Sequence, residues 1–398
     1  MQAYTSFVIV AVIAFLAPLT RAMWPAIIVP SIVLELVGGI IVGPHGIGIA
    51  SSTGPVNVFS TVGLACLLFL AGREIQVDRL RGALLTTSLA GFVISFGLAF
   101  AAALALHAVG LIKTPLLVAI VFVATSLSII IVPLKDAHET DTDWGQQVIA
   151  AAAVAEFGAV ILLSFFYSGQ RSGPGTEIFH LSMFLVLAAL LVFSLTHGAQ
   201  FKRLTDAIDR LEGTSAQIGV RGDFALIAVV AGVATQLGLE TILAAFTVGV
   251  IRGMTSTRDE LAEERLDAVT LGIFIPFFFV DSGLHFDLPA LFSSVSSFIR
   301  LPLFLVAILL VRALPALIYR SRFATRRTAA AGLLQATSLS FIVVATQIGL
   351  MLNIMYAATS TALVGAGLIT VMAFPAIAFA LIGEPEVEAA GETPELDM

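Results

Sequence analysis

The chain has 398 residues, of which 58% are hydrophobic and 12% charged, and its mean hydropathy is +1.02. A soluble domain of this length does not tolerate such a composition, so we predict an all-α integral membrane protein. The formal charge of −7 lies largely in an acidic tail at 383–398, which we expect to be cytoplasmic, and it gives no sign of a nucleic-acid partner. A single cysteine, Cys66, excludes an internal disulfide framework and a cysteine-based metal site.

Apolar stretches long enough to cross ~30 Å of hydrocarbon predict thirteen transmembrane helices. The first stretch has no Lys or Arg before it, so we expect a retained span rather than a cleaved signal peptide. The eighth and ninth are short and nearly continuous, which makes twelve spans the rival count. The predicted spans lie near 4–19, 25–43, 56–72, 83–109, 115–134, 145–168, 178–198, 222–237, 239–253, 267–286, 300–320, 329–350 and 356–382.

Basic residues decide between the two counts, because Lys and Arg accumulate on the cytoplasmic side. With thirteen spans and an outside N-terminus, most basic residues fall on cytoplasmic loops; Lys113, Arg171 and Arg300 fall outside, and Arg312 lies within a span. Twelve spans would place the basic clusters of the second half outside. We therefore predict a multi-pass protein of the cell (inner) membrane with its N-terminus outside and its C-terminus cytoplasmic.

Three short sequence matches indicate an internal repeat. They recur at nearly constant offsets and pair spans that are seven crossings apart. Because seven is odd, the second copy enters the membrane inverted. We predict a membrane transporter domain at 1–382, made of two inverted six-helix repeats, about 4–168 and 222–382, joined by a linker helix at 178–198. The matches are ATSLS (124–128) with ATSLS (336–340), GIIVG (39–43) with GVIRG (249–253), and GREI (72–75) with GLHF (283–286).

Inverted repeats predict alternating access, with an ion site near the bilayer midplane where helices are broken. Hydroxyl groups suit such breaks, because they satisfy released backbone groups and can ligate a cation. The alternative is that these hydroxyls bond back to their own helices or join neighbouring ones. The ion-site residues predicted from the two ATSLS stretches are Thr125, Ser126, Ser128, Thr337 and Ser338.

Glu156 and Arg312 are the two charges predicted to lie deepest in the membrane, in spans six and eleven. A charge at mid-helix costs about 2.5 to 3.5 kcal/mol on insertion scales, so each predicts a function. One interpretation is an ion pair between them. The other is that the Glu156 carboxylate alternates between a proton and a cation, with Arg312 balancing its charge when neither is bound. Oxygen ligands suit Na⁺ or K⁺, and we expect no cofactor and no metal beyond the transported cation.

Other polar residues near the membrane are weaker candidates. Asp281, near the end of span ten, and Glu240, at a span border, are predicted to line a cavity or to be structural. The loop 135–144, KDAHETDTDW, superficially resembles a metal cluster. It is short and lacks the ligand spacing of a known site, so we predict an exposed, solvated loop.

Six stretches together resemble the monovalent cation:proton antiporter-2 family, whose members have NhaA-type folds. The resemblance implies a homodimer formed through a scaffold domain, mobile core helices at 83–168 and 300–382, and crossed broken helices in spans five and twelve. It also implies ion binding at the span-six carboxylate, here Glu156. The stretches are VPSIVLELVGGIIVGPHGIG (29–48), GLACLLFLAGREI (63–75), VATSLSIIIVPLKD (123–136), VIAAAAVAEFGAVILLS (148–164), LGLETILAAFTVGVIRG (237–253) and PFFFVDSGLHFDL (276–288).

The sequence departs from this family at span six. Many relatives carry two adjacent acids there, whereas this chain has Ala155 before Glu156. By resemblance, arginine in span eleven with a single acid predicts electroneutral, one-for-one exchange of Na⁺ or K⁺ for H⁺. We expect no cytosolic nucleotide-binding domain after the last span.

Two other classes of function stand beside antiport. The first is a sodium-coupled symporter of an organic anion on the same fold. The second is an intramembrane enzyme; H-E-x-x-H, G-x-S-x-G and paired intramembrane aspartates are missing from the sequence, so we predict that the protein is not an enzyme.

Overall fold

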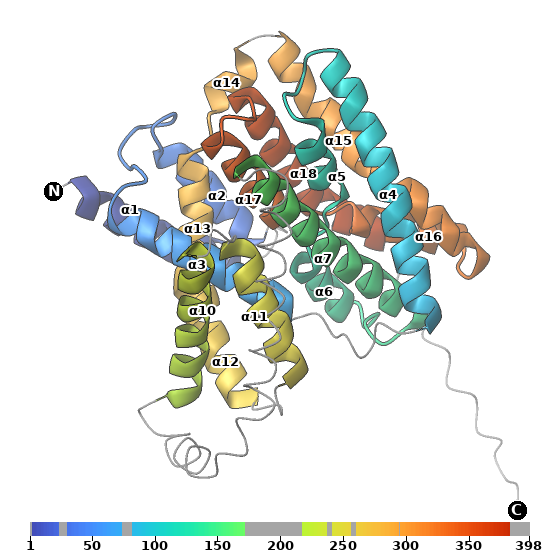
Figure 1. The fold of residues 1–398 in the computed structure, drawn as a ribbon, viewed down its shortest axis with the longest axis horizontal. Coiled ribbons are helices and arrows are strands. Elements are labelled where there is room, and N and C mark those ends of the chain that lie inside the picture. The colour runs from blue at the N-terminus through green and yellow to red at the C-terminus, as the bar shows by residue number, and fades with distance from the viewer. Residues whose placement is uncertain are drawn as a thin grey trace, which may run out of the picture.

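The computed structural model describes residues 2–23, 30–73, 82–171, 217–236, 241–255, 260–293 and 295–382. Every regular element in these ranges is a helix, and the helices form two groups that lie side by side (Figure 1). The first group contains α1 (Gln2–Met23), α2 (Ser31–Val42), α3 (Pro55–Arg73), α10 (Ile218–Gln236), α11 (Thr241–Thr255), α12 (Glu260–Val269), the π-helical turn η2 (Thr270–Phe274) and α13 (Ile275–Leu284). The second contains α4 (Gly82–Ala108), α5 (Pro115–Val123), α6 (Leu127–Asp136), α7 (Asp143–Arg171), α14 (Leu288–Phe292), α15 (Val295–Ala316), the 3-10 turn η3 (Leu317–Ser321), α16 (Thr325–Gln335), α17 (Ser340–Met351) and α18 (Ala357–Ile382).

The predicted spans correspond closely to these helices wherever the structure describes them. Eight helical stretches within the described ranges are long and apolar enough to cross a membrane. The eighth and ninth predicted spans are the separate helices α10 and α11, which pack against each other. The predicted linker helix at 178–198 and the tail at 383–398 lie outside the described residues. The count of thirteen therefore stays a prediction.

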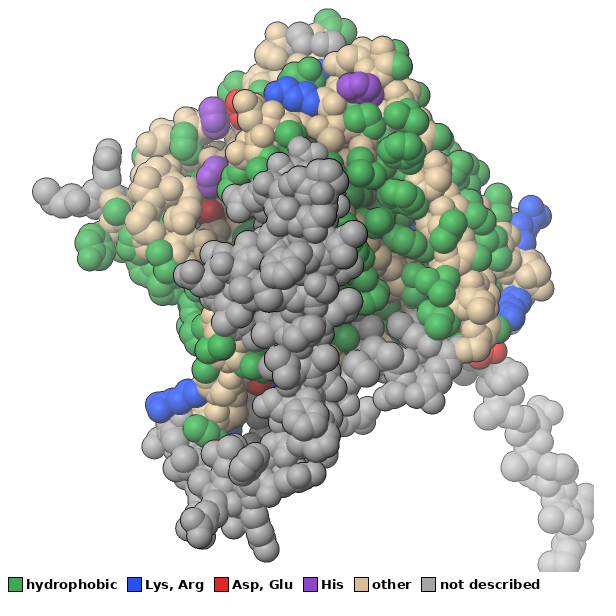
Figure 2. All heavy atoms as spheres, viewed as in Figure 1, with side chains coloured by type: hydrophobic (Ala, Val, Ile, Leu, Met, Phe, Trp, Pro, Cys, Tyr) green, Lys and Arg blue, Asp and Glu red, His purple; other side chains and the backbone are tan. Residues whose placement is uncertain are grey.

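The outer surface of the second group is apolar. Figure 2 shows hydrophobic side chains along the visible side of α4, with Lys and Arg side chains nearer the ends of the molecule. This distribution is typical of a surface that faces hydrocarbon, with basic residues at the polar boundaries. Exposed side chains on this surface include Leu89, Val93 and Leu104 of α4 and Leu303, Val306 and Leu310 of α15.

In the first group, pairs of glycines let helices touch through their backbones. A Cβ added to Gly39 of α2 would collide with the carbonyl oxygen of Val280 on α13, and one added to Gly283 of α13 would collide with that of Leu36 on α2. The crossing of α3 and α11 is built in the same way. There, a Cβ on Gly72 or on Gly249 would collide with a carbonyl oxygen of the opposite helix. Side chains larger than hydrogen do not fit at these four positions.

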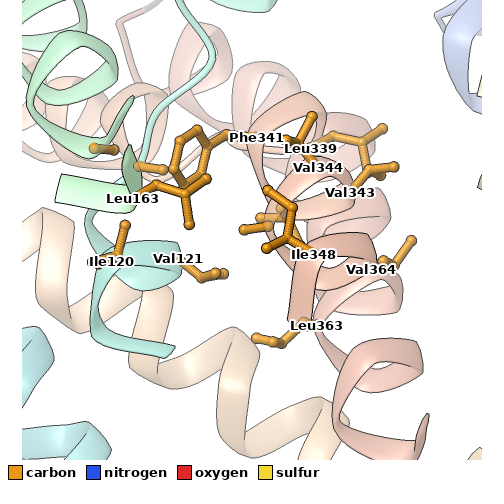
Figure 3. Close-up of a cluster of buried hydrophobic side chains, with 14 of the residues drawn as sticks. Ile120, Val121, Leu163, Leu339, Phe341, Val343, Val344, Ile348, Leu363 and Val364 are labelled. Carbon is orange, nitrogen blue, oxygen red and sulfur yellow. The ribbon is translucent and has the colours of Figure 1, made fainter. Parts of the chain in front are cut away.

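The second group is joined by apolar packing around the helices next to the breaks in spans five and twelve. Figure 3 shows Ile120 and Val121 of α5, Phe341 and Ile348 of α17, and Leu363 of α18 around one apolar cluster. All of these side chains are buried, at 5% exposure or less. This packing holds α5 and α17 relative to each other. It therefore also positions the segment that follows α5 and the segment that precedes α17.

The loop 135–144 differs from its prediction. Glu139 is buried, with 6% of its surface exposed, and it accepts hydrogen bonds from both terminal nitrogens of Arg327 at 3.2 and 3.0 Å. Trp144 Nε1 donates to the Arg327 carbonyl at 2.8 Å, and the guanidinium lies 5.6 Å from the Trp144 ring centre. The prediction of a solvated loop is therefore wrong at Glu139, because the Arg327 guanidinium, 188 residues further along the chain, pairs with this carboxylate.

We predict that Glu139→Gln destabilises the protein by about 2 kcal/mol, because it removes one partner of a charged, two-bond contact. The thermal unfolding midpoint of the purified protein in detergent measures this effect. Arg326→Gln is the matched control, since Arg326 is the exposed neighbour of Arg327. Equal midpoints for the two variants would contradict the prediction.

Candidate functional site

The helices of predicted spans five and twelve are both interrupted at their ATSLS stretches. The first helix ends at Val123 and resumes at Leu127; the second ends at Gln335 and resumes at Ser340. The two non-helical segments contact each other, because Ser126 N donates to the Thr337 carbonyl at 3.0 Å and Leu339 N donates to Ser126 Oγ at 3.2 Å. Four half-helix ends therefore meet in one buried place.

These ends carry partial charges that need partners. A helix N-terminus has free N–H groups and a partial positive charge, and a C-terminus has free carbonyls and a partial negative charge. Thr125 Oγ1, from the first break, donates to the carbonyl of Gln335, the last residue of α16, at 2.6 Å. Thr125, Ser126, Thr337 and Ser338 are each at most 1% exposed, so the protein itself must satisfy these groups.

Glu156 of α7 lies at the first break. Its Oε2 accepts a hydrogen bond at 2.9 Å from Leu127 N, the first residue of α6. The side chain is 8% exposed, and the run of small residues Ala150–Ala153 before it is buried, which lets α7 approach its neighbours closely. A carboxylate at a helix N-terminus is stabilised by the N–H groups and by the helix dipole, so the break and the acid support each other.

Arg312 of α15 lies at the second break. It is 2% exposed, and its Nε donates to the Gln335 carbonyl at 3.2 Å while Nη1 donates to Ser95 Oγ at 3.3 Å. Its Nη2 has no hydrogen-bond partner within the residues that the structure describes. The guanidinium thus faces the negative C-terminal end of α16. The expected pair with Glu156 is not one of these contacts and stays a prediction.

The remaining predicted hydroxyls behave differently from one another. Thr337 Oγ1 donates back to the Leu333 carbonyl at 3.2 Å, as the back-bonding alternative proposed for these residues. Ser338 Oγ is buried and has no hydrogen-bond partner in the described part of the chain. The side chain of Ser128 is outside the described part of the structure.

Asp281 is not placed at the breaks. Asp281 is on α13 in the other group of helices, 3% exposed, and its Oδ2 is 3.9 Å from Nδ1 of His285. Its Oδ1 has no hydrogen-bond partner among the described residues. Glu240 lies outside the described residues.

Sequence reasoning missed several residues of this site. The side chain of Gln335 donates from Nε2 to the Tyr319 hydroxyl at 3.2 Å. The backbone carbonyl of Gln335 accepts hydrogen bonds from Thr125 and Arg312. Thr370 Oγ1 of α18 accepts a hydrogen bond from Ser338 N. Gln335 directly precedes the second ATSLS, which was a usable signal, whereas Thr370 is an ordinary threonine in an apolar helix.

The oxygen atoms at the breaks that could ligate a cation belong to a carboxylate, to hydroxyls and to backbone carbonyls. Hard oxygen ligands of this kind suit Na⁺ or K⁺. In the described ranges, no three His, Cys, Asp or Glu side chains gather in a way that could hold a metal ion. The arrangement therefore places one carboxyl group and several neutral oxygens at the buried breaks, with the Arg312 guanidinium at the second break.

Comparison with known proteins gives consistent results. YjbQ of Bacillus subtilis, whose name describes a Na⁺/H⁺ antiporter, is 28% identical over 380 residues, covering 90% of this chain and 60% of its own. The Na⁺/H⁺-K⁺ antiporter GerN of Bacillus cereus is 25% identical over 266 residues, covering 64% and 65%. The chain thus spans less than two thirds of the length of either relative.

The fold has a solved counterpart. The structure of the sodium proton antiporter MjNhaP1 from Methanocaldococcus jannaschii matches 96% of this chain and 98% of its own, with a TM-score of 0.62 and 17% identity. At this identity the match shows the fold alone. The sequence model described as "Sodium/hydrogen exchanger, transmembrane" matches residues 11–382, nearly the whole chain. The chain is a member of the sodium/hydrogen exchanger transmembrane family.

Proposed function

We propose that this protein is a secondary antiporter that exchanges a monovalent cation, Na⁺ or K⁺, for H⁺ by alternating access. The observation that carries the proposal is the Glu156 carboxylate at the N-terminus of α6, where two broken helices meet. The names of the relatives, which describe Na⁺/H⁺ antiport and, for GerN, K⁺ as well, support it.

The exchange follows from competition at Glu156. The carboxyl group binds one proton or contributes one negative charge to a cation, and it cannot do both. The hydroxyls of Thr125, Ser126, Ser128, Thr337 and Ser338 and the carbonyls of the breaks complete the surroundings of the cation. Arg312, held at the end of α16, supplies fixed positive charge that balances the empty carboxylate. Alternation between the two faces then exchanges one ion for the other.

The inverted-repeat fold is part of the same proposal. Glycines of matching sequence stretches form the two helix crossings: Gly39 of α2 meets Gly283 of α13, and Gly249 of α11 meets the α3 backbone that holds Gly72. An inverted repeat that exchanges α2 with α11 and α3 with α13 maps one crossing onto the other. This supports the inverted repeat. Thirteen spans in an NhaA-like arrangement, core helices at 83–168 and 300–382 and a linker helix at 178–198 belong to the same proposal and rest on the sequence.

Membership of the monovalent cation:proton antiporter-2 subfamily, the homodimer, the inner-membrane location and the outside N-terminus belong to this proposal as well. They rest on the sequence stretches and on the distribution of Lys and Arg. Asp281 and Glu240 are proposed to line the path toward the site. Asp281 is buried, and one of its oxygens has no hydrogen-bond partner in the described ranges, which supports such a position.

Reconstitution into proteoliposomes with an internal pH dye tests the proposal. We expect Na⁺ or K⁺ added outside to drive proton movement outward and raise the internal pH. With a single carboxylate carrying either ion, the exchange is one for one, so a diffusion potential set by an ion that the protein does not transport leaves the rate unchanged. A strong dependence on voltage would contradict one-for-one exchange. Sodium uptake that requires an organic anion and leaves internal pH constant would favour the symporter instead.

A further inference from the structure

The second break is held by a hydroxyl group from a neighbouring helix. Thr370 of α18 is fully buried, and its Oγ1 accepts a hydrogen bond from Ser338 N at 3.2 Å. The hydroxyl hydrogen is shared between the carbonyl oxygens of Gly367, at 2.7 Å, and Ser338, at 3.2 Å. Thr370 therefore contacts both backbone groups of one residue in the break.

A glycine lets α18 come close enough for these bonds. A Cβ on Gly367 would lie 2.9 Å from the Ser338 carbonyl oxygen and within 3.2 Å of the side chains of Leu339 and Ile342. Because Gly367 and Thr370 are three residues apart in a helix, they lie on one face. This face of α18 packs directly on the non-helical segment.

Thr370 and Glu156 act in the same way at the two breaks. Each lies on the helix that follows a broken span, α7 after α6 and α18 after α17. Each accepts a hydrogen bond from a backbone N–H that the break leaves without a helical partner, Leu127 N for Glu156 and Ser338 N for Thr370. The difference is chemical, since one side chain carries a charge and the other does not.

The Ser338 hydroxyl makes no hydrogen bond within the part of the chain that the structure describes. Its Oγ is buried at 0% exposure without a hydrogen-bond partner in the described residues, although a buried hydroxyl normally finds one. Since Thr370 contacts both the N–H and the C=O of this residue, it holds the Ser338 backbone, and with it the Cβ that carries the hydroxyl. An unsatisfied oxygen on a held backbone is available as a cation ligand.

We propose that Thr370 is a positioning residue for the cation site, and that it acts by holding Ser338 so that the Ser338 hydroxyl ligates the cation. This inference rests on the proposed function and adds to it. Glu156 supplies the negative charge at one break, and the Ser338 hydroxyl, positioned by Thr370, supplies a neutral ligand at the other.

The test is the cation dependence of exchange in proteoliposomes for Thr370→Val, which keeps the shape of threonine and removes the hydroxyl. We expect the KM for the cation to rise about tenfold, because the Ser338 hydroxyl is no longer held as a ligand. The maximal rate changes by less than about threefold, because Glu156 is untouched. Thr370→Ser, which keeps the hydroxyl, restores the KM of the unmodified protein.

Thr359→Val is the matched control. Thr359 lies at the start of the same helix, α18, and is 1% exposed. Its hydroxyl donates one hydrogen bond to the Leu111 carbonyl. It loses a similar bond but leaves the break intact, so its KM is expected to stay unchanged. Ser338→Ala raises the KM to the same extent as Thr370→Val. The double variant has the same KM as either single variant, because both changes remove the same ligand, the Ser338 hydroxyl.

The outcomes separate this inference from the proposed function. If the unmodified protein shows no cation–proton exchange, the proposed function fails. If it exchanges normally but Thr370→Val keeps its KM, shares the KM change of Thr359→Val, or adds its effect to that of Ser338→Ala, the role of Thr370 is wrong.

Discussion

Glu156→Gln is expected to reduce cation–proton exchange to the level of empty liposomes. The amide is almost the same size as the carboxyl group and can accept the hydrogen bond from Leu127 N through its oxygen, so the break keeps its backbone partner. It binds no proton in the accessible pH range and brings no negative charge to a cation. Both halves of the exchange are lost together. The internal pH dye, with Na⁺ or K⁺ added outside, measures the result.

Two further variants give this experiment its controls. Glu156→Asp keeps the charge but shortens the side chain by one methylene, so we expect weakened exchange with a raised KM for the cation. Glu35→Gln changes another buried acid, 4% exposed on α2 in the first group of helices, and is expected to retain exchange. Substantial exchange by Glu156→Gln, in protein that elutes as a single species, would refute Glu156 as the shared binding group.

Gly39→Ala is expected to cause one of the largest losses of stability that a single methyl group can produce in this protein. The new Cβ would overlap the Val280 carbonyl oxygen and approach the Gly283 Cα, both part of the α13 backbone. Backbone atoms cannot rotate away as a side chain can, so the helices must separate along their whole contact. We expect a loss of about 3 kcal/mol or more, measured as the thermal unfolding midpoint in detergent.

The control uses the same substitution in open space. Gly97 lies in the middle of α4, and a Cβ added there has no other atom within 4 Å. Gly97→Ala is expected to stabilise the protein slightly, by about 0.5 to 1 kcal/mol, because alanine favours a helix more than glycine does. Equal midpoints for Gly39→Ala and Gly97→Ala would show that α2 and α13 are not in backbone contact.

Much of this architecture could be predicted, because the membrane imposes strong local rules. Hydrocarbon requires long apolar helices, so the predicted spans match α3, α4, α7 and α18 within a few residues. Polar residues inside apolar spans are expensive, so the ATSLS stretches, Glu156 and Arg312 stand out in the sequence. The structure places the breaks at both ATSLS stretches and brings a side chain from α7 and one from α15 to them.

The contacts that the sequence does not reveal join residues far apart in the chain. The loop that holds Glu139 is short and lacks the ligand spacing of a known site, which predicts a solvated loop, and only the fold brings Arg327 to this carboxylate. The sequence gives no reason to single out Thr370, since threonine is common in apolar helices. Its contact with Ser338 depends on Gly367, which lets α18 approach the second break closely. The π-helical turn at Thr270–Phe274 likewise lies in a stretch, TLGIF, whose composition is that of an ordinary helix.

The glycine crossings also restrict how the first group of helices can deform. Val280 and Leu36 present carbonyl oxygens to spaces that only a hydrogen atom can occupy, at Gly39 and Gly283. If α2 slid along α13 so that Ile40 took the place of Gly39, or Ser282 or Leu284 that of Gly283, a carbonyl would meet a Cβ in place of a glycine hydrogen. The glycines therefore restrict the register of the two helices. The same holds for α3 and α11 at Gly72 and Gly249. These four helices are thus held together through their backbones, and for the proposed exchange we expect the movement in the helices around the breaks.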